Sequence, residues 1–289
     1  MLIVGCGDVG LRVAGLLKAS SRLMALTSSP TKTKHLASLG ITPLLGDLDQ
    51  PASLTRLSGV ATHVVHMAPP PLQGDNDPRT QALVQALALR SAPRRVVYGS
   101  TSGVYGDCQG AWIDETQVTR PTTARAQRRV DAEAWLNAWS TSGGPRVKVL
   151  RIPGIYALDR EGGTPRERLL RGTPVLQDSD DVFTNHIHAD DLARATVLSI
   201  WRGSSLRPLH VCDDSDMRMG DYMDLAADFW GLTRPPRISR AQAMQELPPM
   251  TLSFMSESRR MRNHRMKQEL RMKLRYPTVR EGLQGQPVF

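Results

Sequence analysis

The sequence predicts an α/β protein, in which a doubly wound parallel sheet carries a smaller mixed α/β lobe toward the C-terminus. Two observations lead to this fold class. Short, continuously apolar runs alternate with helical patterns through the first half of the chain, as expected for strands that are covered on both faces. The first of these runs is followed at once by a glycine-rich turn and a helix, which is a typical beginning for such a sheet.

Each predicted strand of the first half is followed by a predicted helix. We expect strands over residues 2–4, 23–26, 41–45, 63–67, 95–98 and 147–150, and helices over 10–19, 31–39, 51–57, 80–90 and 124–139. Because crossovers between parallel strands are nearly always right-handed, this order puts helices on both faces of one sheet.

The pattern changes after Pro153. Helices are predicted over residues 166–171, 190–201 and 219–229, a strand over 209–211, and another short helix between two pairs of prolines. We therefore expect a nucleotide-binding core over residues 1–152 and a mixed substrate lobe over 153–289, interleaved with the core. The chain shows no internal repeat.

Composition narrows the class of protein. The chain has 289 residues, of which 40% are hydrophobic, enough for one large domain or one domain with an appended lobe. No apolar run is long enough to cross a bilayer, and no signal peptide is visible, so we expect a cytoplasmic protein without a membrane partner.

Cys6, Cys108 and Cys212 are odd in number and lack C-x-x-C spacing, which favours small buried thiols over a disulfide frame or zinc site.

The formal charge of +9 is unevenly distributed. Between Glu257 and Arg275, eight lysines and arginines are opposed by two glutamates. Such a segment could attract phosphate-bearing substrates or nucleic acid. No aromatic residues are interleaved with these charges, so nucleic-acid binding is disfavoured and we interpret the segment as a solvated helix face.

The glycine-rich turn is a G-x-G-x-x-G placed between a strand and a helix. The first glycine permits the tight turn, the second lets the backbone approach a pyrophosphate, and the third lets helix and strand pack closely. Free N–H groups at the helix N-terminus then face the phosphates. The turn predicts a Rossmann-type dinucleotide site, with these candidate cofactor-binding residues: Gly5, Gly7, Asp8, Val9 and Gly10.

The end of the second strand bears on the choice of dinucleotide. An NAD site usually has an acidic residue about 20 residues beyond the motif, where it binds the ribose hydroxyls. Here the strand ends in Thr27 and Ser28 with no carboxylate, and Lys32 and Lys34 follow. This favours NADP over NAD, with Thr27 and Ser28 as cofactor-binding candidates. The alternative is that these hydroxyl residues only cap the next helix.

Taken in order, the motifs resemble the extended and atypical short-chain dehydrogenase/reductase superfamily, in particular the NAD-dependent epimerase/dehydratase family. The matching segments are the glycine motif and residues 46–48, 64–68, 99–106, 150–156 and 186–193. The resemblance implies a nicotinamide cofactor, a small-molecule substrate and a homodimer formed through helices. It also implies that Asp47 and Leu48 contact adenine, that Ala68 lies along the cofactor, and that Pro153 lies near nicotinamide.

The catalytic Y-x-x-x-K pair of the family is absent. Counting back from Glu133 puts Arg129 at the lysine position and Arg125 at the tyrosine position; a register one residue earlier gives Arg128 and Ala124. The resemblance implies that Thr101 supplies the hydroxyl that shares the substrate oxygen. Arg129 could hold the ribose or a phosphate, or be a solvated helix arginine.

Tyr105, in the V-Y-G segment, is a candidate replacement acid facing the crevice, although the corresponding tyrosine of the family usually lines the pocket.

Nucleotide-sugar enzymes of the family carry an arginine just before the H-x-x-D-L-A-like segment, and residues 182–185 contain none, which argues against nucleotide sugars. For His186 and His188 we prefer strand-end positions beside a helix capped by Asp190 over a metal site, because no third ligand has suitable spacing.

Two functions remain open from the sequence. The first is an oxidoreductase or epimerase-like enzyme that uses NADP, or NAD, on a small polar substrate, with Thr101 and Tyr105 as catalytic candidates. The second is a non-catalytic NAD(P)-binding redox sensor or regulatory module, which the loss of both tyrosine and lysine favours.

Overall fold

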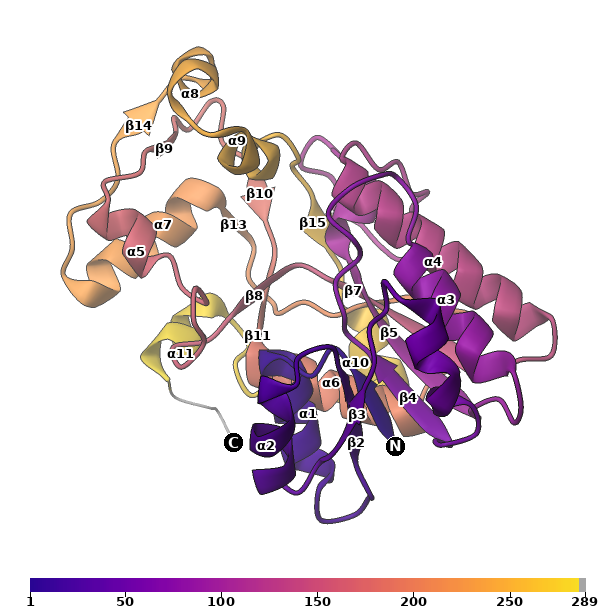
Figure 1. Cartoon of the computed structure of the whole chain (residues 1–289). Coiled ribbons are helices and arrows are strands. Elements are labelled where there is room, and N and C mark those ends of the chain that lie inside the picture. Colours follow the sequence, from indigo (N-terminus) through magenta and orange to yellow (C-terminus); the bar gives the residue numbers. More distant parts are fainter. Residues whose placement is uncertain (286–289) are drawn as a thin grey trace.

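The computed structural model describes residues 1–285, apart from the side chain of Met250, and contains a seven-stranded central sheet (Figure 1). The strand order is β12-β7-β5-β4-β1-β2-β3, and every neighbouring pair is parallel. The strands are β1 (Leu2–Val4), β2 (Met24–Thr27), β3 (Thr42–Leu45), β4 (His63–His66), β5 (Arg95–Thr101), β7 (Arg146–Ile152) and β12 (Leu209–His210). The predicted doubly wound fold class is confirmed.

Two hydrophobic clusters lie on opposite faces of this sheet, because alternate residues of each strand point in opposite directions. On one face Ile3 and Val65 pack against α1 (Asp8–Leu17), α2 (Thr31–Ser38), α6 (Ala189–Trp201) and α10 (His264–Leu270). On the other, Leu2 and Val64 pack against η1 (Pro51–Leu57), α3 (Pro78–Ala88) and α4 (Ala124–Thr141). Burial on both faces explains why β1 is apolar at every position.

The C-terminal half contributes to both the core and a separate lobe. Its elements β12, α6 and α10 join the central sheet and its helical cover. The lobe contains α5 (Arg166–Leu170), α7 (Met219–Trp230), α8 (Arg240–Glu246), α9 (Pro249–Met255) and α11 (Val279–Gln284) (Figure 1). Short strand pairs complete it: β8 (Gly154–Tyr156) with β11 (His186–His188), β9 (Val175–Leu176) with β14 (Arg237–Ile238), and β10 (Phe183–Thr184) with β13 (Met217–Arg218).

The basic segment is not the solvated helix face that we expected. It forms strand β15 (Arg260–Met261), which pairs with β6 (Trp112–Ile113), and then α10. Several of its cations have acidic partners elsewhere in the chain: Arg265 lies 3.5 Å from Glu115 and Lys267 lies 2.5 Å from Asp214. Much of the local positive charge is therefore balanced in the folded protein.

Within residues 1–285, no helix has both the length and the apolar character needed to span a membrane. The three cysteines are free thiols; Cys212 is buried, whereas Cys6 and Cys108 are half-buried.

Candidate functional site

The glycine turn lies where β1 ends at the centre of the sheet. Gly5 has φ +87°, and a Cβ added there would lie 2.3 Å from the backbone nitrogen of Ala68, so β1 and β4 can approach only at a glycine. A Cβ at Gly10 would lie 2.7 Å from the carbonyl oxygen of Gly5. At Gly7 a Cβ would meet nothing within 4 Å, so this side of the turn faces open space. The turn thus has the packing and the open face that a dinucleotide pyrophosphate requires.

Asp8 introduces a carboxylate at the first turn of α1, where backbone N–H groups lack intrahelical partners. Arg12 (3.2 Å) and Arg160 (3.1 Å) both pair with it. Arg12 also contacts Asp159 at 2.7 Å and Asp190 at 2.5 Å, which ties the loop between β8 and α5 to α1. The negative charge at this helix N-terminus is therefore counterbalanced by two guanidinium groups.

The end of β2 offers hydroxyls and a nearby cation. The Thr27 hydroxyl accepts a hydrogen bond from the backbone N–H of Ser29 at 3.2 Å, whereas Ser28 is exposed. Burial raises the pKa of the Cys6 thiol to about 11, and the positive charge of Lys32 partly offsets this effect, so Lys32 lies within electrostatic reach of the glycine turn. This edge of the crevice carries positive charge and hydroxyl donors.

The segments after β3 and β4 border the same crevice. The Asp47 carboxylate accepts a hydrogen bond from the backbone of Asp49 at 3.0 Å, and Leu48 packs against the hydrophobic cluster under α3. The carbonyl oxygen of Ala68 accepts a hydrogen bond from Arg129 at 3.2 Å. These contacts fix the backbone at the positions where the adenine and the middle of the cofactor are expected.

Arg129 joins the ends of β4 and β5. Besides Ala68, its guanidinium donates to the carbonyl oxygen of Gly99 at 2.9 Å and to the hydroxyl of Tyr98 at 3.0 Å. Arg128 instead donates to the carbonyl oxygen of Gly74. Arg129 thus contacts the ends of the central strands, whereas Arg128 contacts the loop before α3.

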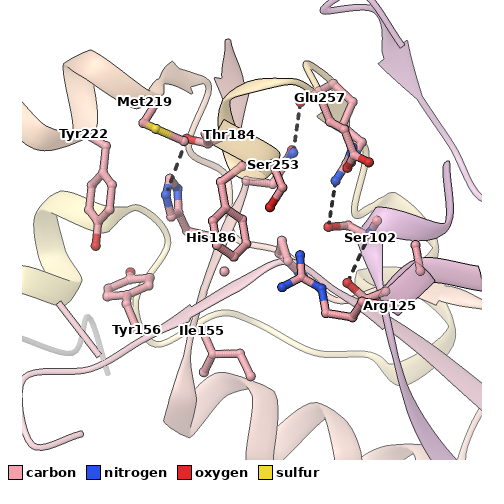
Figure 2. Close-up of a pocket in the computed structure, with 18 of the residues that line it drawn as sticks. Ser102, Arg125, Ile155, Tyr156, Thr184, His186, Met219, Tyr222, Ser253 and Glu257 are labelled. Atoms are coloured by element: carbon pink, nitrogen blue, oxygen red, sulfur yellow. Dashed lines mark hydrogen bonds and ion pairs between the residues drawn. The ribbon is translucent and has the colours of Figure 1, made fainter. Parts of the chain in front are cut away.

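A cavity of about 590 Å³ opens between the carboxyl ends of these strands and the lobe (Figure 2). Thr101, Arg129 and Pro153 line it on the core side, and the Thr101 hydroxyl accepts a hydrogen bond from the backbone of Gly103 at 3.2 Å. Arg125 also lines it, and its guanidinium lies 4.9 Å from the ring centroid of Phe254. Arg125, which the count back from Glu133 puts at the family's tyrosine position, therefore faces the cavity.

Tyr105 does not point into this cavity, contrary to our expectation. Its side chain is buried, and its hydroxyl lies 2.5 Å from Nε2 of His210 and accepts a hydrogen bond from Arg151 at 2.7 Å. Burial is the main cause that raises the pKa of Tyr105 to about 12. Because both sides of the hydroxyl are occupied by core residues, Tyr105 is not placed to protonate a substrate.

The two histidines of β11 differ in their surroundings. His188, rather than Asp190, caps α6: its Nδ1 accepts a hydrogen bond from the backbone of Asp190 at 3.2 Å. The Asp190 carboxylate pairs with Arg12 instead. His186 lines the cavity, and burial lowers its pKa to about 4. Within residues 1–285, no group of three or more potential ligands is arranged for a metal ion.

Sequence reasoning missed the lobe side of the cavity. Arg168 of α5, Tyr222 of α7 and Phe254 of α9 line it (Figure 2 labels Tyr222). Each lies in a helix without a recognisable motif, and their proximity depends on how the lobe packs. Local sequence therefore carried no signal that could have identified them.

Comparison with known proteins gives the family. The sequence model of the NAD dependent epimerase/dehydratase family matches residues 1–208. The chain belongs to this family. A functionally unknown conserved protein from Silicibacter pomeroyi is 32% identical, with a TM-score of 0.82 over 98% of this chain and 96% of that one.

Two further relatives are more distant. MoeE5, solved in complex with UDP-glucose and NAD, is 23% identical with a TM-score of 0.76, over 99% of this chain and 96% of its own, a likeness of fold. Protein YeeZ of Escherichia coli (strain K12) is 25% identical over 155 residues, which make up 54% of this chain. The match spans about half of YeeZ, namely 53% of its length.

Proposed function

We propose that this family member is an oxidoreductase or epimerase-like enzyme that binds a nicotinamide dinucleotide and moves a hydride to or from a small polar substrate. One observation carries the proposal: Thr101 and Arg129 line the same cavity, which opens at the carboxyl ends of adjacent parallel strands. This is the edge at which open α/β sheets bind their ligands.

The residues present fit the cofactor. The open face at Gly7 and the helix N-terminus would hold the pyrophosphate, and the backbone near Asp47, Leu48 and Ala68 would border the adenosine side. Arg129 would hold the nicotinamide ribose, since it retains the positive charge of the family's lysine. The bound nicotinamide would supply the acceptor or donor of hydride.

NADP is the preferred cofactor in this proposal. The exposed Ser28 hydroxyl can donate a hydrogen bond to a 2′-phosphate, and Lys32 adds positive charge close to the glycine turn. No carboxylate follows β2 directly to repel that phosphate. NAD remains the alternative, and the two are separated by measuring both affinities.

Thr101 orients the substrate in this proposal. Its hydroxyl already accepts a hydrogen bond from Gly103, so its own proton is available for a substrate oxygen. Arg125 and Arg129 are cations that do not release protons near neutral pH. The proton that accompanies hydride transfer therefore comes from water in the cavity or from the substrate, and we expect slow chemistry compared with enzymes that position an acid.

A second candidate function is a non-catalytic NAD(P)-binding module that signals the redox state of the cofactor to a partner. The replacement of the catalytic tyrosine and lysine positions by Arg125 and Arg129 favours it. The cavity beside Thr101 favours the enzyme instead, because a sensor would not need a separate space for a substrate.

Titration of the protein with NADPH and NADH, followed by a turnover screen with carbonyl and alcohol substrates, tests the proposal. We expect tight binding of NADPH and turnover that falls when Thr101 is changed to valine, which keeps the shape of the side chain and removes the hydroxyl. Binding of neither dinucleotide would reject the proposal. Tight binding without turnover on any substrate would support the binding module.

A further inference from the structure

The cavity wall carries more positive than negative side chains. Within residues 1–285 it is lined by four arginines but one glutamate, namely Arg125, Arg129, Arg168, Arg259 and Glu257. Such an imbalance in a cleft attracts anions and disfavours cations. An arginine that already pairs with protein groups is less available to a ligand than one that does not.

Three of the arginines already have partners. Arg129 donates to the ends of β4 and β5, and Arg125 lies over the ring of Phe254. Arg259 lies 2.8 Å from Glu257 and donates to the carbonyl oxygen of Gly106. These three guanidinium groups are held in place by the protein.

Arg168 is different. Its Nη2 is buried and, within residues 1–285, has no hydrogen-bond partner, and no carboxylate of those residues lies within ion-pair distance. Burial lowers the pKa of this guanidinium, and so does the positive charge of Arg171; among the described residues the opposing influence is Tyr222, not an acid. A partly buried cation that no carboxylate of the described residues neutralises is unfavourable for the free protein.

Two hydrogen-bonding side chains line the same cavity as Arg168. The rings of Tyr222 and His186 are 4.3 Å apart, and Figure 2 shows both on the side of the cavity opposite Arg125. The Nδ1 atom of His186 is buried without a partner, while its Nε2 lies 3.5 Å from the hydroxyl of Thr184. Burial keeps the imidazole neutral and the phenol protonated, so neither side chain would repel an anion.

The residue just before His186 argues against a nucleoside diphosphate at this site. Asn185 stands there, and its amide donates to the carbonyl oxygen of Arg259 at 2.9 Å and accepts from the backbone of Met261 at 2.8 Å. Both ends of this side chain are therefore bound to the backbone of residues 259–261. The site presents one unpaired guanidinium, which suits a single oxyanion.

We propose that Arg168, with Tyr222 and His186, binds the carboxylate or phosphate monoester group of a small substrate whose reacting carbon lies at Thr101. This inference rests on the proposed function, because the same cavity would hold the reacting end of the cofactor. Guanidinium binds either oxyanion through paired, charge-assisted hydrogen bonds. The lobe would then select substrates by an acidic group rather than by a nucleotide.

Calorimetric titration with two probes, inorganic phosphate and malonate, tests the site with and without saturating NADPH. Arg168→Met removes the charge, and Arg166→Met is the matched control, because Arg166 is exposed on the same helix. We expect the wild type to bind at least one probe, Arg168→Met to bind it about tenfold more weakly or worse, and Arg166→Met to stay within about twofold. The probe that binds more tightly tells carboxylate from phosphate ester.

Several results would overturn the anion site: no binding of either probe by the wild type, unchanged binding by Arg168→Met, or an equal loss in Arg166→Met. The dinucleotide affinities are read separately. A protein that binds the probes through Arg168 but binds no NADPH would retain the anion site and reject the proposed function.

Thermal unfolding controls for a structural role of Arg168. Since no carboxylate of residues 1–285 pairs with Arg168, we expect Arg168→Met without ligand to melt at or above the wild-type temperature. A much lower melting temperature would show that Arg168 holds the lobe together, which would contradict the inference. Should Arg168→Met fail to fold, Arg168→Lys, which keeps the charge but loses the planar fork, should still weaken probe binding measurably; unchanged binding would overturn the site.

Discussion

The guanidinium of Arg151 donates a hydrogen bond to the hydroxyl of Tyr105 over 2.7 Å, inside the protein core. The same hydroxyl lies 2.5 Å from Nε2 of His210, whose Nδ1 lies 3.0 Å from the carbonyl oxygen of Arg262. A carbonyl can only accept, so Nδ1 carries the hydrogen and Nε2 accepts from Tyr105. Arg151 is in turn paired with Glu133 at 2.7 Å. Tyr105 is thus one member of a continuous buried network.

Removing the Tyr105 hydroxyl should reduce stability rather than cofactor binding. Tyr105→Phe leaves Nε2 of His210 and one donor of Arg151 without a partner in the core, which costs about 1–3 kcal/mol of unfolding free energy. Urea denaturation measures this loss, and NADPH titration should be unchanged. Tyr276→Phe is the control, because within residues 1–285 the Tyr276 hydroxyl makes no hydrogen bond. A normal stability with a large loss of turnover would restore the catalytic role of Tyr105.

The fold could be predicted from the sequence because its determinants are local. Strand β1 and the glycine turn are adjacent in sequence, and the apolar character of β4, β5 and β7 follows directly from burial on both faces. The orientation of Tyr105 could not be predicted in this way. Its partners Arg151 and His210 lie 46 and 105 residues further along the chain, so the direction of its hydroxyl depends on tertiary packing.

Partners that are distant in sequence also explain why the basic segment was wrongly predicted to be a solvated helix face. Its net charge is visible in the sequence, but its partners Glu115 and Asp214 come from distant segments. Arg168 shows the converse case. Nothing in its helix distinguishes it from Arg166, and only the packed lobe shows that one is exposed and the other lines a cavity.

Cofactor preference should respond to a charge at the end of β2. Ser28→Asp places a carboxylate where a 2′-phosphate is expected, so NADPH affinity should fall about tenfold more than NADH affinity. Fluorescence titration of both dinucleotides measures the ratio. Ser28→Asn, which is similar in size and uncharged, is the control. Equal losses for NADPH and NADH, or a wild-type preference for NADH, would contradict the assignment of NADP.

Asp8 should oppose cofactor binding through its charge. Its carboxylate lies at the N-terminus of α1, where the pyrophosphate is expected, and Arg12 and Arg160 neutralise it. Asp8→Asn should therefore tighten NADPH binding about two- to fivefold. Asp159→Asn removes another partner of Arg12 away from the helix N-terminus and should leave the affinity unchanged. Weaker NADPH binding by Asp8→Asn would mean that the ion pairs position the turn.

Buried histidines should make the protein sensitive to acid. Burial lowers the pKa of His66 and His210 to about 3 and that of His186 to about 4, whereas the unfolded chain titrates near 6.5. Because the folded pKa values are depressed, the unfolded state binds more protons below about pH 6.5. The contribution to stability is complete above that pH and is lost as the pH falls toward the folded pKa values.

His210 gives the sharpest test of this dependence. Each such histidine removes about 1.4 kcal/mol of stability per pH unit, or about 2 kcal/mol between pH 6.5 and pH 5. His210→Gln cannot titrate, so the difference in unfolding free energy between pH 7 and pH 5 should shrink by about 2 kcal/mol in urea denaturation. Burial raises the pKa of Asp213, which acts in the opposite direction, but this effect is common to both proteins and cancels in the comparison. The exposed His35, changed to glutamine, should leave the pH dependence as it is. If His210→Gln has the same pH dependence as the wild type, His210 is not held neutral by Tyr105, Arg151 and the surrounding core.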